Sequence, residues 1–195
     1  ASELSTADLI AANTHVGHAP SRWTASNTPY ILGTRSGLHI IDPNQSLAHL
    51  RRAAHFVRRV SANGGIVLFV GHAPDARPLA ADAAVHAGQY YVHDWVPGTL
   101  TNTDQVVVAR QAPFDRDGSL PAQAPKPDVL VILDITSKPS LRAVKEARKL
   151  NIPTIAVVDT DVDARWVTYP VPANDDSAES LALVARALAQ AAADG

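Results

Sequence analysis

The sequence contains no cysteine and no methionine, and aromatic residues make up only 5% of it. The absence of cysteine excludes disulfide bonds, zinc sites built on thiolates, and thiol catalysis. No apolar run approaches the ~20 residues that a membrane-spanning helix needs, so we expect no such helix. Hydrophobic residues still account for 46% of the 195 residues, which is enough for a real core, and we expect one domain over residues 1–195.

The sequence motifs of nucleotide-binding and hydrolytic enzymes are missing as well. The turn Gly71-His72-Ala73-Pro74 has neither the G-x-G-x-x-G of dinucleotide-binding folds nor the G-K-[ST] of a phosphate loop. It is interpreted as a plain tight turn, with a phosphate at the start of the next helix as the alternative. There is no G-x-S-x-G nucleophile elbow. We therefore expect no catalytic residues and no cofactor.

Four short apolar runs alternate with amphipathic stretches, which is typical of parallel strands covered on both faces. The predicted strands are 66–70, 90–93, 129–133 and 154–158. Capping and stop signals predict four helices, at 42–62, at 75–87, from about 137 to 150, and from Asp176 onward with Glu179 as its capping-box partner. These elements predict an α/β fold with a flavodoxin-like (Rossmann-like) doubly wound parallel sheet.

Two segments fall outside this alternation. Residues 28–42 hold two short apolar runs around Arg35-Ser36-Gly37, which predicts an amino-terminal β-hairpin outside the sheet. Residues 104–127 are rich in proline and aspartate, which predicts a surface loop.

Carboxylates follow two of the predicted strands, at the edge where such sheets bind ligands. Asp134 ends the third strand, and the motif Asp159-x-Asp161-x-Asp163 follows the fourth and matches the opening of a calcium loop. The glycine of that loop is replaced by Ala164, and Pro170 stands where its last glutamate ligand belongs. We interpret the aspartates as caps of strand ends.

Histidines offer a second possible kind of metal site. His15 and His18 stand three residues apart, but Gly17 lies between them and no further ligand cluster accompanies them. We therefore expect no metal site.

The net charge of −2 hides an uneven distribution. Residues 1–70 carry six arginines against three acidic residues, whereas 71–125 and 126–195 each carry more acidic than basic side chains. Any site for a polyanion is therefore expected in the first third of the chain.

One face of the predicted helix at 42–62 is strongly basic. At about 100° per residue, its apolar residues occupy one side and four arginines the other, namely Arg51, Arg52, Arg58 and Arg59. No acidic residue occurs between Asp42 and Asp75. Arginine suits phosphate because its guanidinium binds two oxygens at once. The face is either solvated or a phosphate-binding surface.

Several short stretches, in order along residues 14–181, resemble the ribosomal protein S2 family of the small subunit, of bacterial or organellar type. They are His15-Val16-Gly17-His18 with Trp23, the segment 30–42 (YILGTRSGLHIID), Leu68-Phe69-Val70-Gly71, the segment 95–102 (WVPGTLTN), residues 128–134, Glu146-Ala147 with 150–153 (LNIP), Val157-Val158-Asp159-Thr160, and the segment 169–177 (YPVPANDDS).

The resemblance implies a flavodoxin-like domain at the junction of the head and body of the small ribosomal subunit. It would bind ribosomal RNA and neighbouring ribosomal proteins in translation, without a membrane or a small-molecule substrate. We predict RNA contacts by the four helix arginines and by Arg22, Trp23 and Arg35. In the family the motif around Asp159 is scaffold.

The chain departs from the family pattern in three places. His72 and Ala73 replace basic residues, Asp94 replaces an arginine, and residues 104–127 stand where bacterial members insert a long helical hairpin. Such trimming suggests a mitochondrial ribosome, with the bacterial cytoplasm or another organelle as alternatives.

Two other functions stay open at the sequence level. One is a Rossmann-like enzyme for a phosphorylated or metal-bound small molecule, built on Gly71, Asp134 and Asp159 around one crevice. The other is a ribosome-derived protein that has lost its RNA contacts and binds only proteins.

Overall fold

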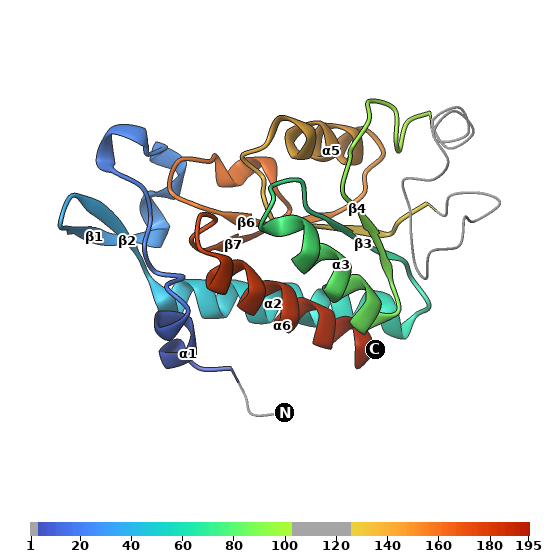
Figure 1. Ribbon diagram of the computed structural model, residues 1–195, viewed down its shortest axis with the longest axis horizontal. Helices are drawn as coiled ribbons and strands as arrows, with labels where there is room; N and C mark the ends of the chain where they lie inside the picture. Colours follow the sequence, from blue (N-terminus) through green and yellow to red (C-terminus); the bar gives the residue numbers. More distant parts are fainter. Residues whose placement is uncertain (1–3, 103–125) are drawn as a thin grey trace.

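The computed structural model describes residues 4–102 and 126–195. Its main sheet has five parallel strands in the order β4-β3-β5-β6-β7, and β1 and β2 form a separate antiparallel pair at one end of the molecule (Figure 1). The strands are β1 (Ile31–Arg35), β2 (Leu38–Ile41), β3 (Val67–Val70), β4 (Tyr90–Val92), β5 (Val129–Ile132), β6 (Thr154–Val158) and β7 (Tyr169–Pro172).

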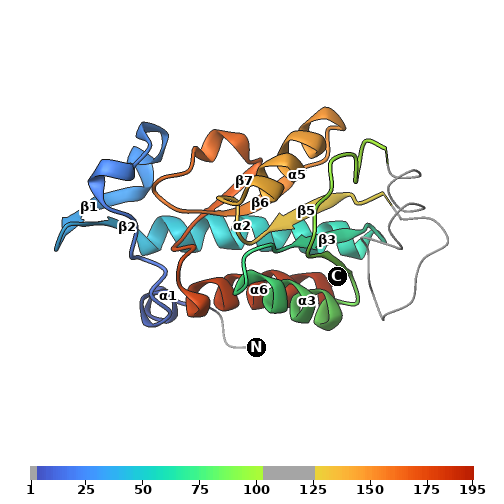
Figure 2. The ribbon, with the colours of Figure 1, turned by 45° about the horizontal axis from the view of Figure 1, so that its top comes forward.

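Helices cover both faces of the main sheet. The α-helices are α1 (Thr6–Ala11), α2 (Pro43–Ala62), α3 (Ala76–Ala87), α5 (Lys138–Lys149) and α6 (Ala178–Ala193), and the 3₁₀ helices are η1 (Pro20–Arg22), η2 (Ala25–Tyr30) and η3 (Ala164–Trp166). One apolar core joins the sheet to α2, α3 and α6, and the other joins its opposite face to α5 (Figure 2). The predicted doubly wound α/β fold is confirmed.

The strand order identifies the type of sheet. Counted along the chain within the main sheet alone, the order is 2-1-3-4-5, which is that of flavodoxin-like folds. The order reverses between β3 and β5, and ligands of such folds bind at the carboxyl ends of these strands. Alternate residues of each strand enter opposite cores, with Phe69 on the α2 side and Leu68 on the α5 side.

Local sequence signals account for most of the element boundaries. Asp42 caps α2 by accepting a hydrogen bond from the Asn44 amide (2.9 Å), and Pro43 opens the helix. Between β1 and β2, Ser36 and Gly37 both have positive φ angles (52° and 80°), as a tight type I′ hairpin turn requires. The predicted hairpin outside the sheet is confirmed.

The main differences from the sequence prediction are the strand β7 and the cap of the last helix. The prediction missed β7, because Pro170 and Pro172 lack the N–H groups of an inner strand. β7 pairs only with β6, at the edge of the sheet, where prolines are tolerated. The last helix is capped by Ser177 instead of Asp176, and the Ser177 hydroxyl also bonds Glu179 (2.9 Å).

The predicted loop at 104–127 lies outside the described residues except for its last two. Within the described ranges, no helix is long and apolar enough to cross a membrane.

Candidate functional site

The amino-terminal segment forms several hydrogen bonds with the loop that follows β6. The Thr24 amide donates to the Thr160 carbonyl (2.8 Å), and the Thr24 hydroxyl donates to the Asp161 carbonyl (3.0 Å). The buried Asn27 side-chain amide donates to the carbonyls of Asp159 (2.9 Å) and Val162 (2.6 Å). Residues far apart in the sequence therefore hold this loop in one conformation.

Gly17 allows the two segments to approach closely. A Cβ atom at this position would lie 2.7 Å from Thr160 Cγ2, which is closer than real contacts allow. The next amide, of His18, donates to the Thr160 hydroxyl oxygen (3.0 Å). The glycine thus permits the contact that carries the His18 side chain to the carboxyl end of β6.

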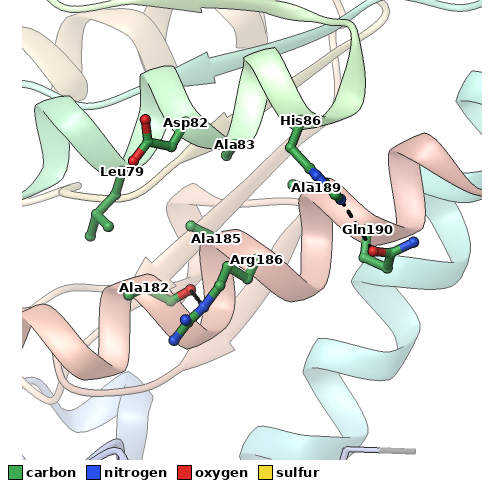
Figure 3. A pocket seen from close by; sticks show the side chains of 9 residues that line it. All are labelled: Leu79, Asp82, Ala83, His86, Ala182, Ala185, Arg186, Ala189 and Gln190. Atoms are coloured by element: carbon green, nitrogen blue, oxygen red, sulfur yellow. Dashed lines mark hydrogen bonds between the residues drawn. The ribbon is translucent and has the colours of Figure 1, made fainter. Parts of the chain in front are cut away.

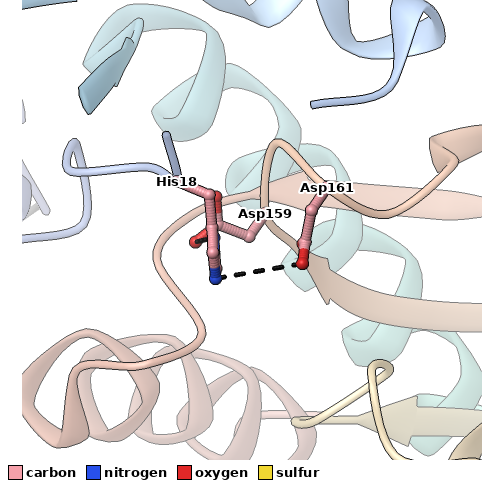
Figure 4. A group of neighbouring side chains, drawn as sticks. All are labelled: His18, Asp159 and Asp161. Atoms are coloured by element: carbon pink, nitrogen blue, oxygen red, sulfur yellow. Dashed lines mark ion pairs between the residues drawn. The ribbon is translucent and has the colours of Figure 1, made fainter. Parts of the chain in front are cut away.

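His18 lies among aspartates from two loops, and Figure 4 shows it with Asp159 and Asp161 of the loop after β6. Its Nδ1 is 3.2 Å from a carboxylate oxygen of Asp159, and its Nε2 is 3.3 Å from Asp176 and 3.8 Å from Asp161. The Asp159 side chain is almost fully buried, and that of His18 is 10% exposed. We call His18, Asp159, Asp161, Asp175 and Asp176 the His18 cluster.

Burial and mutual repulsion shift the proton affinities in the His18 cluster. Burial, reinforced by the charges of Asp159, Asp161 and Asp176, raises the pKa of Asp175 to about 7. Burial also raises the pKa of Asp159, although the Thr160 amide and His18 act against it. Burial alone would lower the pKa of His18, but the neighbouring carboxylates raise it overall. At neutral pH Asp175 is therefore partly protonated, whereas an isolated aspartate would have lost its proton.

The same atoms form possible metal ligands. Ligand atoms of His18, Asp159 and Asp161 lie within 4.8 Å of one another, as do those of His18, Asp175 and Asp176. Imidazole and carboxylate groups are common ligands of zinc. The sequence offered a different grouping, His15 with His18, and neither set of ligand atoms in the described residues includes His15.

The aspartate motif after β6 does not act as one calcium loop. Asp163 caps η3 through the Arg165 amide and forms an ion pair with the Arg165 guanidinium (2.6 Å). Neither of the two sets of ligand atoms around His18 includes Asp163. Asp159 accepts a hydrogen bond from the Thr160 amide (2.5 Å), as expected of a strand-end cap.

Asp134 fills the place where a phosphate would bind. It follows β5, beside the point where the strand order reverses, and its two oxygens accept the amides of His72 (3.0 Å) and Ala73 (2.8 Å). The Ser140 hydroxyl donates to it as well (3.2 Å). Because this carboxylate already accepts the amides of His72 and Ala73, these two donors are not available to an anionic ligand. The prediction of a capping aspartate is confirmed.

The α2 basic face, Arg51, Arg52, Arg58 and Arg59, is exposed as predicted, opposite the buried Leu50, Ala53 and Val57. Arg51 donates to the Leu4 carbonyl (3.1 Å). Arg58 pairs with Asp194 at the end of α6 (2.9 Å). The sequence between Asp42 and Asp75 holds no acid, but the fold brings Asp194 to α2 from the other end of the chain.

The remaining predicted RNA-binding residues lie elsewhere. Arg22 in η1 pairs with Asp161 (3.3 Å) and so borders the His18 cluster. Trp23 is 42% exposed and meets the His39 ring edge-on at 5.8 Å. Arg35 is exposed at the tip of the hairpin. The structure brings together Arg22, Trp23 and the β6 loop, while Arg35 and α2 form separate surfaces.

A groove of about 400 Å³ runs between α3 and α6 (Figure 3). Its floor is alanine, and its rim carries Asp82, His86, Arg186 and Gln190. His86 and Gln190 bond each other across it (3.1 Å). No set of convergent polar groups is formed that would orient a small ligand.

Fold and site together define a flavodoxin-like α/β domain in which Asp134 accepts the amides before α3 and in which exposed basic surfaces are present. A family model of "Ribosomal protein S2" matches residues 9–116 and 115–195. The chain belongs to the ribosomal protein S2 family.

Bacterial and mitochondrial relatives are similar along nearly the whole chain. The small ribosomal subunit protein uS2 of Caulobacter vibrioides is 39% identical, over 99% of this chain and 82% of its own length. The small ribosomal subunit protein uS2m of Schizosaccharomyces pombe is 38% identical, over 98% of this chain and 75% of its own. That of Neurospora crassa is also 38% identical, over the whole chain but only 47% of its own length.

Proposed function

We propose that this chain is a structural constituent of the small ribosomal subunit and that it binds ribosomal RNA and neighbouring ribosomal proteins without catalysing a reaction. The observation that carries the proposal is identity of 38–39% to small ribosomal subunit proteins over almost the full chain. The hydrogen bonds from the amides of His72 and Ala73 to Asp134 agree with a non-catalytic role, because they engage donors that could otherwise bind a phosphate.

The RNA contacts are assigned to Arg22, Trp23 and Arg35 and to the α2 basic face. The exposure of all four α2 arginines supports this assignment, and so does the half-exposed ring of Trp23. Arg58 already has a carboxylate partner, so it contributes least of the four.

A mitochondrial ribosome is the proposed location. The alignment with the Caulobacter relative spans 223 positions against 195 residues of this chain, so at least 28 positions have no counterpart here. The alignment with the Schizosaccharomyces mitochondrial relative spans 200 positions and 98% of this chain, so only about 9 positions have no counterpart here. The two parts of the family match meet at residues 115–116, inside the segment expected to replace a bacterial insertion.

Co-sedimentation tests the proposal. Tagged full-length chain should migrate with intact small subunits, remain there at moderate salt, and crosslink to ribosomal RNA under ultraviolet light. Migration with free protein would contradict a ribosomal role. Stable co-sedimentation without any RNA crosslink would favour the alternative in which the chain binds only proteins.

A further inference from the structure

Helix α5 carries a second cluster of cations, on the opposite side of the sheet from α2 (Figures 1 and 2). Five of its twelve residues are exposed and basic: Lys138, Arg142, Lys145, Arg148 and Lys149. At about 100° per residue these five fall within an arc of about 120°. Ala143, Val144 and Ala147 face the core on the other side. We call the five cations the α5 basic face.

The acidic residues near this face are engaged elsewhere. Glu146, the one acid of α5, is 8% exposed and turned inward, where it accepts the amides of Gly98 (2.9 Å) and Leu100 (2.9 Å). Asp161 pairs with Arg22 and Asp163 with Arg165. Among the described residues, none of the five cations forms an ion pair. The whole positive charge of the face is thus available to a partner.

Helix stability does not account for this charge. Arg148 and Lys149 lie in the last turn, where cations interact favourably with the helix dipole. Lys138 opens the helix, where a positive charge opposes the dipole, and Arg142 lies in the second turn, beyond its reach. A basic stripe from end to end is what an external polyanion would need.

An aromatic ring adjoins the cations. Trp166 in η3 is 37% exposed, and its ring centre lies 5.7 Å from Lys145 Nζ and 5.6 Å from Arg148 Cζ. Trp166 and Lys145 also line a surface depression of about 470 Å³ that reaches Arg22. Asp161 and Asp163 line it as well, and each is paired with an arginine. Exposed rings among arginines and lysines allow bases to stack while phosphates are held, which is how proteins bind RNA outside regular duplexes.

We propose that the α5 basic face, with Trp166 and Arg22, is a second RNA-binding surface that holds backbone phosphates. This inference rests on the proposed ribosomal role, because it requires RNA beside the chain. RNA fits the surface better than an acidic protein does, since both arginine forks and an exposed ring are present. As α2 and α5 cover opposite faces of the sheet, the chain lies between two RNA segments.

The test compares two double variants of the full chain. Lys145→Gln with Arg148→Gln removes two charges from the α5 basic face, and Arg77→Gln with Arg186→Gln removes two exposed charges from α3 and α6. Binding to purified small-subunit ribosomal RNA is measured over a series of salt concentrations. The α5 variant should lose about two units of log–log salt slope, since each phosphate contact contributes about 0.9. The control variant should keep the slope of the unchanged chain, and the α5 variant should melt like it. The control also loses the Arg77–Asp94 ion pair (3.3 Å) and the Arg77 hydrogen bond to the His72 carbonyl (2.8 Å), so a small loss of stability there is expected.

Three outcomes would overturn the inference. If the α5 variant kept the wild-type salt slope, the inference of a second RNA-binding surface would be contradicted, but the proposed function would not. Absence of salt-dependent binding by the unchanged chain would contradict both. Protection of Lys145 and Lys149 from acetylation in assembled subunits, combined with an unchanged salt slope, would assign the face to a protein neighbour.

Discussion

At the scale of single residues, the His18 cluster brings a histidine from the amino-terminal segment into contact with aspartates from the last third of the sequence. Four aspartates surround one histidine, and Arg22 supplies one more positive charge beside Asp161. Burying this excess of negative charge is unfavourable unless protons or a cation compensate for it. The pKa values of Asp159, Asp175 and His18 are all raised, so these groups hold their protons to higher pH than isolated groups would, and a divalent cation would serve the same purpose.

Stability should therefore depend on pH through Asp175. Its pKa of about 7 in the folded chain exceeds the ordinary value of 3.8, so folding favours the protonated form. This stabilisation is complete below about pH 4 and is lost as the pH rises through about 7. Asp175→Asn keeps a neutral side chain at every pH. In the presence of a chelator, the variant should match the wild type near pH 4 and exceed its unfolding free energy at pH 8, by at most about 4 kcal/mol.

Urea unfolding at the two pH values measures this effect. Asp82→Asn, which changes an exposed carboxylate on α3, serves as the control and should show the pH dependence of the wild type. If Asp175→Asn followed that dependence too, the buried charge would be compensated by groups other than its own proton.

At the scale of elements, local signals fixed the fold and long-range contacts fixed the site. Strand runs, helix caps and the hairpin turn depend on a few neighbouring residues, so the sequence predicted most of them to within one or two positions. The sequence did not predict β7, because prolines are unfavourable in most strands. They are tolerated in β7 only because it lies at the edge of the sheet. Capping by Asp134 followed from its place after a strand. The partners of His18 did not, because Asp159 and Asp176 are brought to it only by the folded chain.

Glu146 shows how one long-range contact holds an element in place. Its carboxylate accepts hydrogen bonds from the Trp95 indole (3.3 Å) and from the amides of Gly98, Leu100 and Thr101. It thereby anchors the segment after β4 to α5. Glu146→Gln replaces one acceptor oxygen by an NH₂ group facing these donors. The unfolding free energy should fall by about 2–3 kcal/mol, because buried donors lose a charged acceptor.

Urea denaturation compares this variant with Arg142→Gln, an exposed change one turn earlier on the same helix, which should lie within about 0.5 kcal/mol of the wild type. Equal stability of the two variants would mean that the segment after β4 is held by other contacts.

At the scale of the whole molecule, charge is sorted by face and not by position along the chain. The last third of the sequence has more acids than bases, which led to the expectation that any polyanion site lies in the first third. The fold turns Glu146 inward and pairs Asp161 and Asp163 with arginines, so that α5 presents only cations. A chain with a net charge of −2 thereby carries two basic faces on opposite sides of one sheet.

The α2 basic face gives the prediction that tests this arrangement as a whole. Changing Arg51, Arg52, Arg58 and Arg59 together to glutamine leaves the buried side of α2 untouched, and glutamine is a good helix former. The chain should fold, incorporation into small subunits should fall, and the salt slope for RNA binding should decrease by up to about one unit per phosphate lost.

The lost Arg58–Asp194 ion pair needs its own control. Asp194→Asn breaks the same pair without removing a cation from α2, and an exposed pair of this kind stabilises the fold by at most about 1 kcal/mol. This variant should therefore assemble like the wild type.

Because α2 and α5 lie on opposite faces of the sheet, their RNA contacts should be independent. The loss of slope from the α2 variant and from Lys145→Gln with Arg148→Gln should then add when all six changes are combined. Normal assembly of the quadruple variant would mean that the α2 face is only solvated and that RNA contacts come from Arg22, Trp23, Arg35 and α5.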